Sequence, residues 1–221
     1  MDNAWKEDLA SGASSLGVPL SAPQIDQLAI HVDLLIRWND KLNLTRICAP
    51  HEILSKHVLD SLAVLRVLPA GLDRILDIGS GAGFPGIPIA IARPETRITL
   101  VDAVGKKVQF CKNAIAQTQL KGCEAVHCRL EGNPSREKIR AANVVVSRAF
   151  TSLTNFLGMV RPYLAPDGSV IAMLSGREDD ETLRRTADAL AFDIAEAHAF
   201  GLGDGLGARR VLRLVPRGTA P

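Results

Sequence analysis

A glycine-rich segment that follows a short apolar run carries the clearest chemical signal in the chain. Gly79, Gly81 and Gly83 alternate with small residues there, and Asp77 stands two positions before the first of them. Glycine turns tightly and lets a ligand approach the main chain, because it has no Cβ atom. Between a strand and a helix, such a loop is typical of nucleotide and nucleoside cofactor sites. A tight turn that binds no ligand is the alternative.

Two registers of the glycines predict two different cofactors. Gly81-x-Gly83-x-x-Gly86 matches the fingerprint of dinucleotide-binding proteins. The spacing that begins at Gly79 matches the loop of methyltransferases that use S-adenosylmethionine. The fingerprint should begin where the strand ends, and the apolar run ends at Ile78, so this second register fits better. A nicotinamide-dependent oxidoreductase stays as the alternative.

Two acidic positions follow the next apolar runs. Asp102 ends the second run, and its two carboxylate oxygens could accept both ribose hydroxyls of a bound nucleoside. Capping of the following helix is the alternative role for this residue. After the third run come Arg129, Leu130 and Glu131, where an acid and a backbone amide could meet an adenine edge. Taken alone, this triplet is typical of plain surface.

Composition excludes several other classes of protein. The chain has 221 residues, 47% of them hydrophobic, as expected for one globular domain or one domain with an appendage. Its net charge of +2 argues against a polybasic binding protein. The four cysteines form no C-x-x-C pair, so we expect no metal site. The N-terminus is too polar for a signal peptide and no apolar stretch could span a membrane, so we expect a soluble, cytoplasmic protein.

Other chemistries find less support. Ser147 and Ser175 lack the context of a nucleophilic serine, and no phosphate-binding loop of the Gly-Lys-Ser/Thr type occurs. His57 and Asp60 share one face of a predicted helix, where a structural hydrogen bond is favoured over catalysis.

The elements that must position these residues fall into two zones. Residues 1–70 have a helical period, with a capping box from Ser21 to Gln24 and a second helix that opens at Pro50. From residue 74 onward, short Val-, Ile- and Leu-rich runs alternate with helical segments, which predicts a parallel sheet covered on both faces. Strands are predicted at 74–79, 97–103, 124–128, 143–149 and 169–175, and helices at 85–92, 105–120, 134–140, 153–164 and 179–191. Residues 193–200 and 210–215 flank the glycine-rich stretch 201–207 and predict an antiparallel hairpin at the end of the sheet.

Five segments together resemble one known family, the bacterial 16S ribosomal RNA guanine-N7 methyltransferases, also called glucose-inhibited division protein B. The resemblance runs almost from end to end and includes the Phe-Pro-Gly-Ile-Pro continuation of the glycine loop, which is more specific than glycines alone. The matching segments are Trp38-Asn39-x-x-x-Asn43-Leu44-Thr45, Lys56-His57-Val58-Leu59-Asp60-Ser61, residues 76–88, Leu100-Val101-Asp102-Ala103-x-Gly105-Lys106-Lys107 and Val146-Ser147-Arg148-Ala149-Phe150.

The resemblance implies a class I S-adenosylmethionine-dependent methyltransferase: an α/β, Rossmann-like, seven-stranded, mostly parallel sheet with an antiparallel C-terminal hairpin. Residues 1–70 would form an N-terminal helical extension and residues 71–221 the methyltransferase domain. It further implies that Asp102 holds the ribose and that S-adenosylmethionine contacts a set of residues on the loops: Gly79, Ser80, Gly81, Gly83, Phe84, Leu130, Glu131 and Arg148.

The implied reaction methylates N7 of a guanine in 16S ribosomal RNA within the small ribosomal subunit, by a protein expected to be a monomer. Guanine N7 has an in-plane lone pair and no proton, so this attack needs alignment and no general base. Arg148 is the residue expected to act in catalysis, steering an RNA phosphate or guanine O6, or else pairing with Glu131 or Asp102. A ribosome- or RNA-binding module with a non-catalytic nucleoside pocket is a further alternative.

Two positions depart from the family pattern. Ser175 stands where the family often has lysine, which puts in doubt an RNA contact there, and Arg210 follows Arg209 where an Arg-His pair is common.

Overall fold

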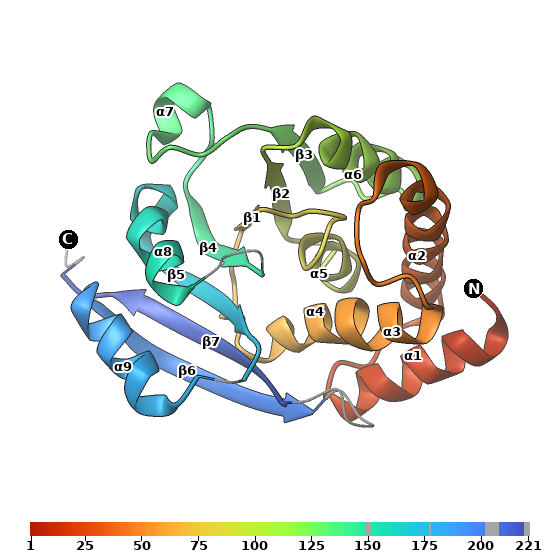
Figure 1. The fold of residues 1–221 in the computed structure, drawn as a ribbon, viewed down its shortest axis with the longest axis horizontal. Helices are drawn as coiled ribbons and strands as arrows, with labels where there is room; N and C mark the ends of the chain where they lie inside the picture. Colours follow the sequence, from red (N-terminus) through yellow and green to blue (C-terminus); the bar gives the residue numbers. More distant parts are fainter. Residues whose placement is uncertain (149–151, 177, 202–207, 219–221) are drawn as a thin grey trace.

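A computed structural model describes residues 1–148, 152–176, 178–201 and 208–218 (Figure 1). Its seven strands form one sheet in the order β3-β2-β1-β4-β5-β7-β6. The first five strands pair in parallel, and β7 runs antiparallel to both of its neighbours. The strands are β1 (Arg74–Ile78), β2 (Arg97–Asp102), β3 (Cys123–His127), β4 (Ala142–Ser147), β5 (Leu164–Leu174), β6 (Phe192–Gly201) and β7 (Ala208–Pro216).

This sheet confirms the predicted fold class, including the antiparallel hairpin at its end. The glycine-rich turn of the hairpin, residues 202–207, lies outside the described residues, as do Ala149 and Phe150 of the fifth family segment.

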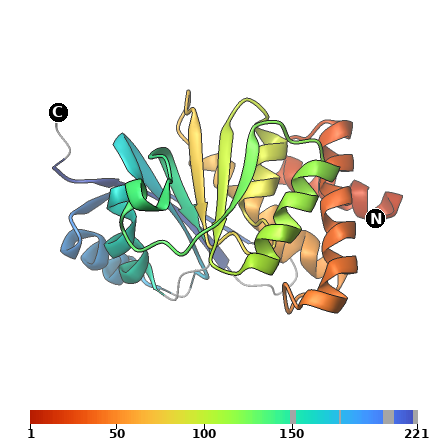
Figure 2. The ribbon, with the colours of Figure 1, turned by 90° about the horizontal axis from the view of Figure 1, so that it is seen from above.

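Helices cover both faces of the sheet, as Figure 2 shows from above. Alternate residues of each strand point to opposite faces, so the core has two parts. Ile75 and Leu100 pack with α5, α6 and the N-terminal helices, whereas Leu76 and Val101 pack with α8 and α9. The helices are α1 (Asn3–Ser15), α2 (Ala22–Leu42), α3 (Pro50–Ile53), α4 (Asp60–Leu62), α5 (Gly86–Ala92), α6 (Gly105–Gln117), α7 (Pro134–Glu137), α8 (Leu153–Val160) and α9 (Asp180–Ala189).

The N-terminal helices follow their predicted start signals. The Gln24 side-chain oxygen accepts hydrogen bonds from the Ser21 backbone N–H (2.9 Å) and the Ser21 hydroxyl (3.0 Å). The helix that opens at Pro50 continues through a π-helical stretch (Leu54–Leu59) and a 3₁₀ turn (Ala63–Arg66). Side chains of these helices belong to the same core as one face of the sheet, and the division at residue 70 stays a proposal.

Four helices end earlier than the sequence predicts, α6 at Gln117 and α9 at Ala189 among them. α7 stops at Glu137, because Lys138 adopts a left-handed conformation with φ of 57°. α8 stops at Val160, and β5 begins at Leu164 after a short 3₁₀ turn that contains Pro162. Within the described part of the chain, no helix is both long and apolar enough to cross a bilayer.

Candidate active site

The glycine loop joins β1 to α5 at the carboxyl edge of the sheet. Gly79, Gly81 and Gly83 have φ values of 72°, 58° and 82°, all in the left-handed region that favours glycine. Gly86 instead begins α5, where an added Cβ would lie 2.1 Å from Leu100 Cδ2. The three turn-forming glycines are therefore those of the register that begins at Gly79, and Gly86 permits close packing of helix on sheet.

Asp77 lies beneath this loop and is completely buried. Its Oδ2 accepts a hydrogen bond from the Gly86 backbone N–H (2.9 Å), which fixes the start of α5. Among the described residues, its Oδ1 has no hydrogen-bond partner. Burial raises the pKa of Asp77 to about 7, because a charged carboxylate is costly to desolvate.

Asp102 ends β2 and holds the outer side of the loop. Its Oδ2 accepts a hydrogen bond from the Gly81 backbone N–H (3.0 Å), and its Oδ1 accepts one from the Val104 backbone N–H (2.8 Å). The Lys107 ammonium lies 3.9 Å from Oδ2. Asp102 therefore orders the loop and the approach to α6, and each oxygen keeps a second lone pair with which it could accept a ribose hydroxyl.

Two carbonyl groups of the loop accept hydrogen bonds from side chains of α2 and α6. The Cys111 thiol of α6 donates to the Gly81 carbonyl (3.4 Å), and burial raises the pKa of that thiol to about 12, so it stays protonated. The His31 Nε2–H of α2 donates to the Ala82 carbonyl (2.9 Å). Neither contact could be predicted from the sequence, because nothing in the spacing of α2 or α6 points to a loop fifty or thirty residues away.

Phe84 was expected to contact the cofactor, and its side chain is almost wholly buried, with 2% exposed. Its ring lies between His31 (centroids 4.7 Å apart) and His57 (4.8 Å), and the Arg148 guanidinium carbon lies 5.4 Å from its centre. The ring therefore supports the loop from inside. Contact with a ligand on the loop would have to come from its main-chain atoms.

Arg148 follows β4 and is held by the N-terminal helices. Its Nη1 donates to the Lys56 carbonyl (3.0 Å) and lies 3.6 Å from Asp60 Oδ2. Arg209 of β7 approaches the other oxygen of Asp60, at 3.8 Å. Glu131 and Asp102 are the ion-pair partners that the sequence suggests for Arg148, and the structure gives it Asp60 instead. Burial raises the pKa of Asp60, and the two arginines oppose that rise.

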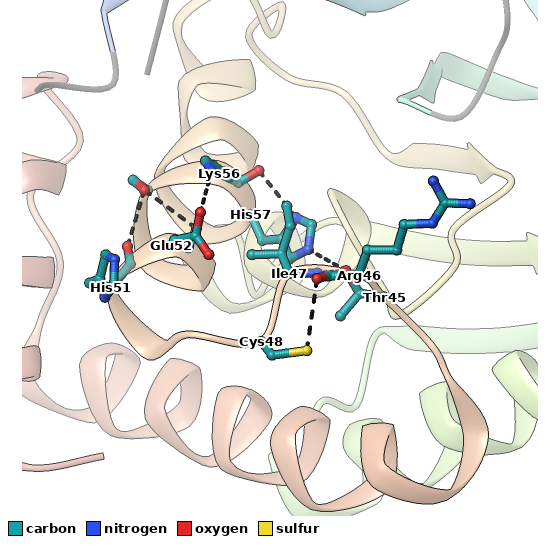
Figure 3. A network of polar contacts seen from close by, with 9 residues as sticks. Thr45, Arg46, Ile47, Cys48, His51, Glu52, Lys56 and His57 are labelled. Carbon is teal, nitrogen blue, oxygen red and sulfur yellow. Dashed lines mark hydrogen bonds and ion pairs between the residues drawn. The ribbon is translucent and has the colours of Figure 1, made fainter. Parts of the chain in front are cut away.

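The two N-terminal family segments meet where Thr45 contacts His57 (Figure 3). Arg148 binds the carbonyl of the neighbouring residue Lys56. Asn39 brackets Thr45, accepting from its N–H (2.9 Å) and donating to its carbonyl (3.0 Å). His57 Nδ1 contacts the Lys56 carbonyl (3.1 Å), so Nδ1 carries the proton and the Thr45 hydroxyl donates to Nε2 (3.0 Å). Burial, and then Arg148, lower the pKa of His57 to about 3. His57 is thus a neutral structural residue, and its hydrogen bonds go to Thr45 and Lys56.

The loop after β3 presents Leu130 and Glu131, and neighbouring side chains hold its backbone. Glu137 Oε1 accepts from the N–H of Glu131 (2.6 Å) and of Asn133 (3.2 Å). The Tyr163 hydroxyl accepts from the Gly132 N–H (2.7 Å) and donates to Glu137 Oε2 (2.6 Å). The Glu131 N–H thus has a partner inside the protein, while its carboxylate is exposed.

A cavity of about 230 Å³ lies beside Arg148, at the carboxyl ends of β4 and β5. The Ser147 hydroxyl, on its wall, donates to the Ile78 carbonyl (2.7 Å), which places the cavity next to the glycine loop. Ser175 also lines it. Among the residues that the structure describes, no group of histidine, cysteine and acidic side chains could hold a metal ion.

The sheet, its helical layers and the loop after β1 define the fold class, which is the one found in S-adenosylmethionine-dependent methyltransferases. A crystal structure of such an enzyme from Aquifex aeolicus shares the fold, with a TM-score of 0.56 and 14% sequence identity over 74% of this chain and 92% of that one.

A narrower similarity follows from the sequence. The family model GidB, rRNA small subunit methyltransferase G, matches residues 24–204. Ribosomal RNA small subunit methyltransferase G of Myxococcus xanthus is 44% identical over 203 residues, which is 91% of this chain and 93% of that protein. The protein of the same name from Geobacter sp. is 41% identical over 98% of this chain and 100% of its own length. The chain belongs to this family.

Proposed function

We propose that this protein transfers the methyl group of S-adenosylmethionine to N7 of a guanine in 16S ribosomal RNA. Membership of the rRNA small subunit methyltransferase G family carries this proposal, because the match covers most of the chain. The proposed substrate is the RNA within the small ribosomal subunit, the proposed state a monomer and the proposed location the cytoplasm.

Open space at Gly81 supports a cofactor site on the outer side of the loop. A Cβ added at Gly81 would meet only the Gly79 carbonyl, at 3.9 Å, whereas one added at Gly83 would lie 2.4 Å from Ile87 Cδ1. The loop thus packs tightly inward and is open outward. We propose that Gly79, Ser80, Gly81, Gly83 and the main chain of Phe84 line the site, that Asp102 accepts the ribose hydroxyls, and that Leu130 and Glu131 border the adenine.

The proposed reaction needs no general base from the protein. S-adenosylmethionine supplies an electrophilic methyl group on a sulfonium. Guanine N7 has a lone pair and no proton to lose, so the residues must align the two partners and exclude water. We propose that Arg148 is the catalytic residue, because its guanidinium is fixed by Lys56 and Asp60 beside the 230 Å³ cavity. It would orient guanine O6 or a phosphate of the RNA.

A methyl-transfer assay with labelled S-adenosylmethionine tests the proposal. Small subunits that lack the modification should accept label, and chemical cleavage at N7-methylguanine should map it to one position. Bare 16S RNA, compared at the same salt concentration, tests whether the particle is the substrate. No label in either form would refute methyl transfer to this RNA.

Ligand-induced changes in melting temperature separate the alternatives. S-adenosylmethionine should raise the melting temperature and NAD should not. Stabilisation by NAD alone would favour an oxidoreductase, and stabilisation by S-adenosylmethionine without transfer would favour a non-catalytic RNA-binding module.

A further inference from the structure

Helix α2 is tied to the rest of the molecule by side chains that donate to main-chain carbonyls. The three donors lie at positions i, i+3 and i+7, which places them on one face of the helix. The bonds run from Gln24 Nε2 to Ile91 O at the end of α5 (3.0 Å), from Gln27 Nε2 to Thr118 O beyond α6 (2.8 Å), and from His31 Nε2 to Ala82 O in the glycine loop (2.9 Å).

The bond from His31 has a defined direction. A carbonyl oxygen can only accept, so Nε2 must carry the proton. Nδ1 then has no proton to donate, and in the described structure it also has no partner. The ring is completely buried beside Phe84 and Phe110, with centroids 4.7 Å and 5.9 Å away. Burial lowers the pKa of His31 to about 4, so the imidazole stays a neutral donor in ordinary buffers.

The acceptor of this bond sits at the centre of the loop. Ala82 lies between Gly81 and Gly83, whose positive φ values set the direction of its carbonyl. Without a donor, the Ala82 carbonyl would be a buried acceptor with no partner. Loop conformations that turn this carbonyl toward solvent would then be favoured in free energy. A loop that spends less time in its binding conformation binds its ligand more weakly in proportion.

We propose that His31 is a positioning residue for the cofactor loop: its bond to Ala82 holds the loop in the conformation that binds S-adenosylmethionine, although His31 itself does not touch the cofactor. This proposal rests on the proposed function. It gives one residue of α2, in the helical N-terminal segment, a role in supporting the loop that binds the cofactor.

Calorimetric titration of S-adenosylmethionine into four proteins tests the proposal. His31→Phe keeps the aromatic contacts and removes the donor, and we expect its Kd to rise about tenfold, equivalent to about 1.4 kcal/mol. His31→Gln places an amide N–H near the position of Nε2 and should restore most of the affinity. Gln27→Met removes a bond of the same kind from the same helix, away from the loop, and should bind like the parent.

The outcomes separate the two proposals. If the parent protein binds no S-adenosylmethionine, the proposed function fails. If the parent binds and His31→Phe binds equally well, His31 does not position the loop. An equal loss in Gln27→Met would also overturn the proposal, because the effect would then come from general loosening of α2.

Nitrogen-15 NMR of the parent protein gives a test that needs no substitution. His31 should show the Nε2–H tautomer, and its Nε2 proton should exchange more slowly once S-adenosylmethionine is bound. The opposite tautomer, or exchange unchanged by the cofactor, would overturn the proposal.

Discussion

The two buried histidines should make the stability of the protein depend on pH in a way that single substitutions can isolate. His31 and His57 have pKa values of about 4 and about 3 in the folded protein, against 6.5 when exposed. The folded state therefore takes up protons less readily than the unfolded chain. The stability due to the neutral imidazoles is fully present above pH 6.5 and is lost as the pH falls from there toward 4.

The size of the effect follows from proton linkage. At pH 5 the unfolded chain is almost fully protonated at His31, while the folded protein is about one-tenth protonated, so lowering the pH from 8 to 5 costs about 2 kcal/mol. His57 adds a similar loss of about 2 kcal/mol. The size of each loss depends mainly on the pKa of the unfolded chain, because the folded pKa values, about 4 and about 3, both lie below pH 5.

Asp77 acts in the opposite direction. Its pKa is raised to about 7, so the folded protein binds this proton more tightly than the unfolded chain and gains about 2 to 3 kcal/mol as the pH falls from 8 to 5. The total pH dependence of the parent protein therefore mixes gains and losses. Only a comparison between the parent and a variant separates the histidine contribution.

Urea unfolding of the parent and of His31→Phe, each at pH 8 and pH 5, gives that comparison. The loss of unfolding free energy between the two pH values should be about 2 kcal/mol smaller in the variant. Gln27→Met has no titrating group and should show the parental loss, whatever its absolute stability. An equal loss in parent and His31→Phe would refute the conclusion that His31 is buried and neutral.

Three further substitutions probe the site. Gly81→Ala should cost about 1 kcal/mol of unfolding free energy, because alanine is strained at the left-handed φ of this position. Calorimetry should show weaker S-adenosylmethionine binding, because the added methyl group would point to the open side of the loop. Parental affinity would place the cofactor elsewhere. Arg148→Ala should lower methyl transfer about 100-fold in protein that remains folded, and unchanged turnover would remove Arg148 from the site. Tyr163→Phe should cost about 1–3 kcal/mol by urea unfolding and weaken cofactor binding, because Gly132 and Glu137 both lose a partner; a neutral result would mean that the loop after β3 is held otherwise.

The sheet could be predicted because its strands are short apolar runs bounded by polar or glycine residues. Residues 74–79, for example, closely match β1, and the glycine loop follows from local spacing alone. The predictions of helix ends were weaker where one residue decides the outcome, as at Lys138.

The contacts behind the loop could not be predicted, because they join distant segments. The pairing of Arg148 with Asp60 spans about ninety residues, and nothing in either local pattern selects Asp60 over Asp102. Tyr163 and Glu137 are likewise joined only by the fold. The sequence therefore predicts candidate residues for the site, while the way they are held required the structure.

The placement of β7 has a consequence for the order in which the enzyme matures during synthesis. Among the strands that the structure describes, β7 comes last in sequence order, yet it lies between β5 and β6 in the sheet. Until it emerges, β5 has a bare edge and β6 has no strand to join. β7 also brings Arg209 to Asp60, which lies near the beginning of the chain and holds Arg148. A nascent chain whose β7 has not yet left the ribosome would thus have its glycine loop but would lack Arg209 beside Asp60, the residue that pairs with Arg148.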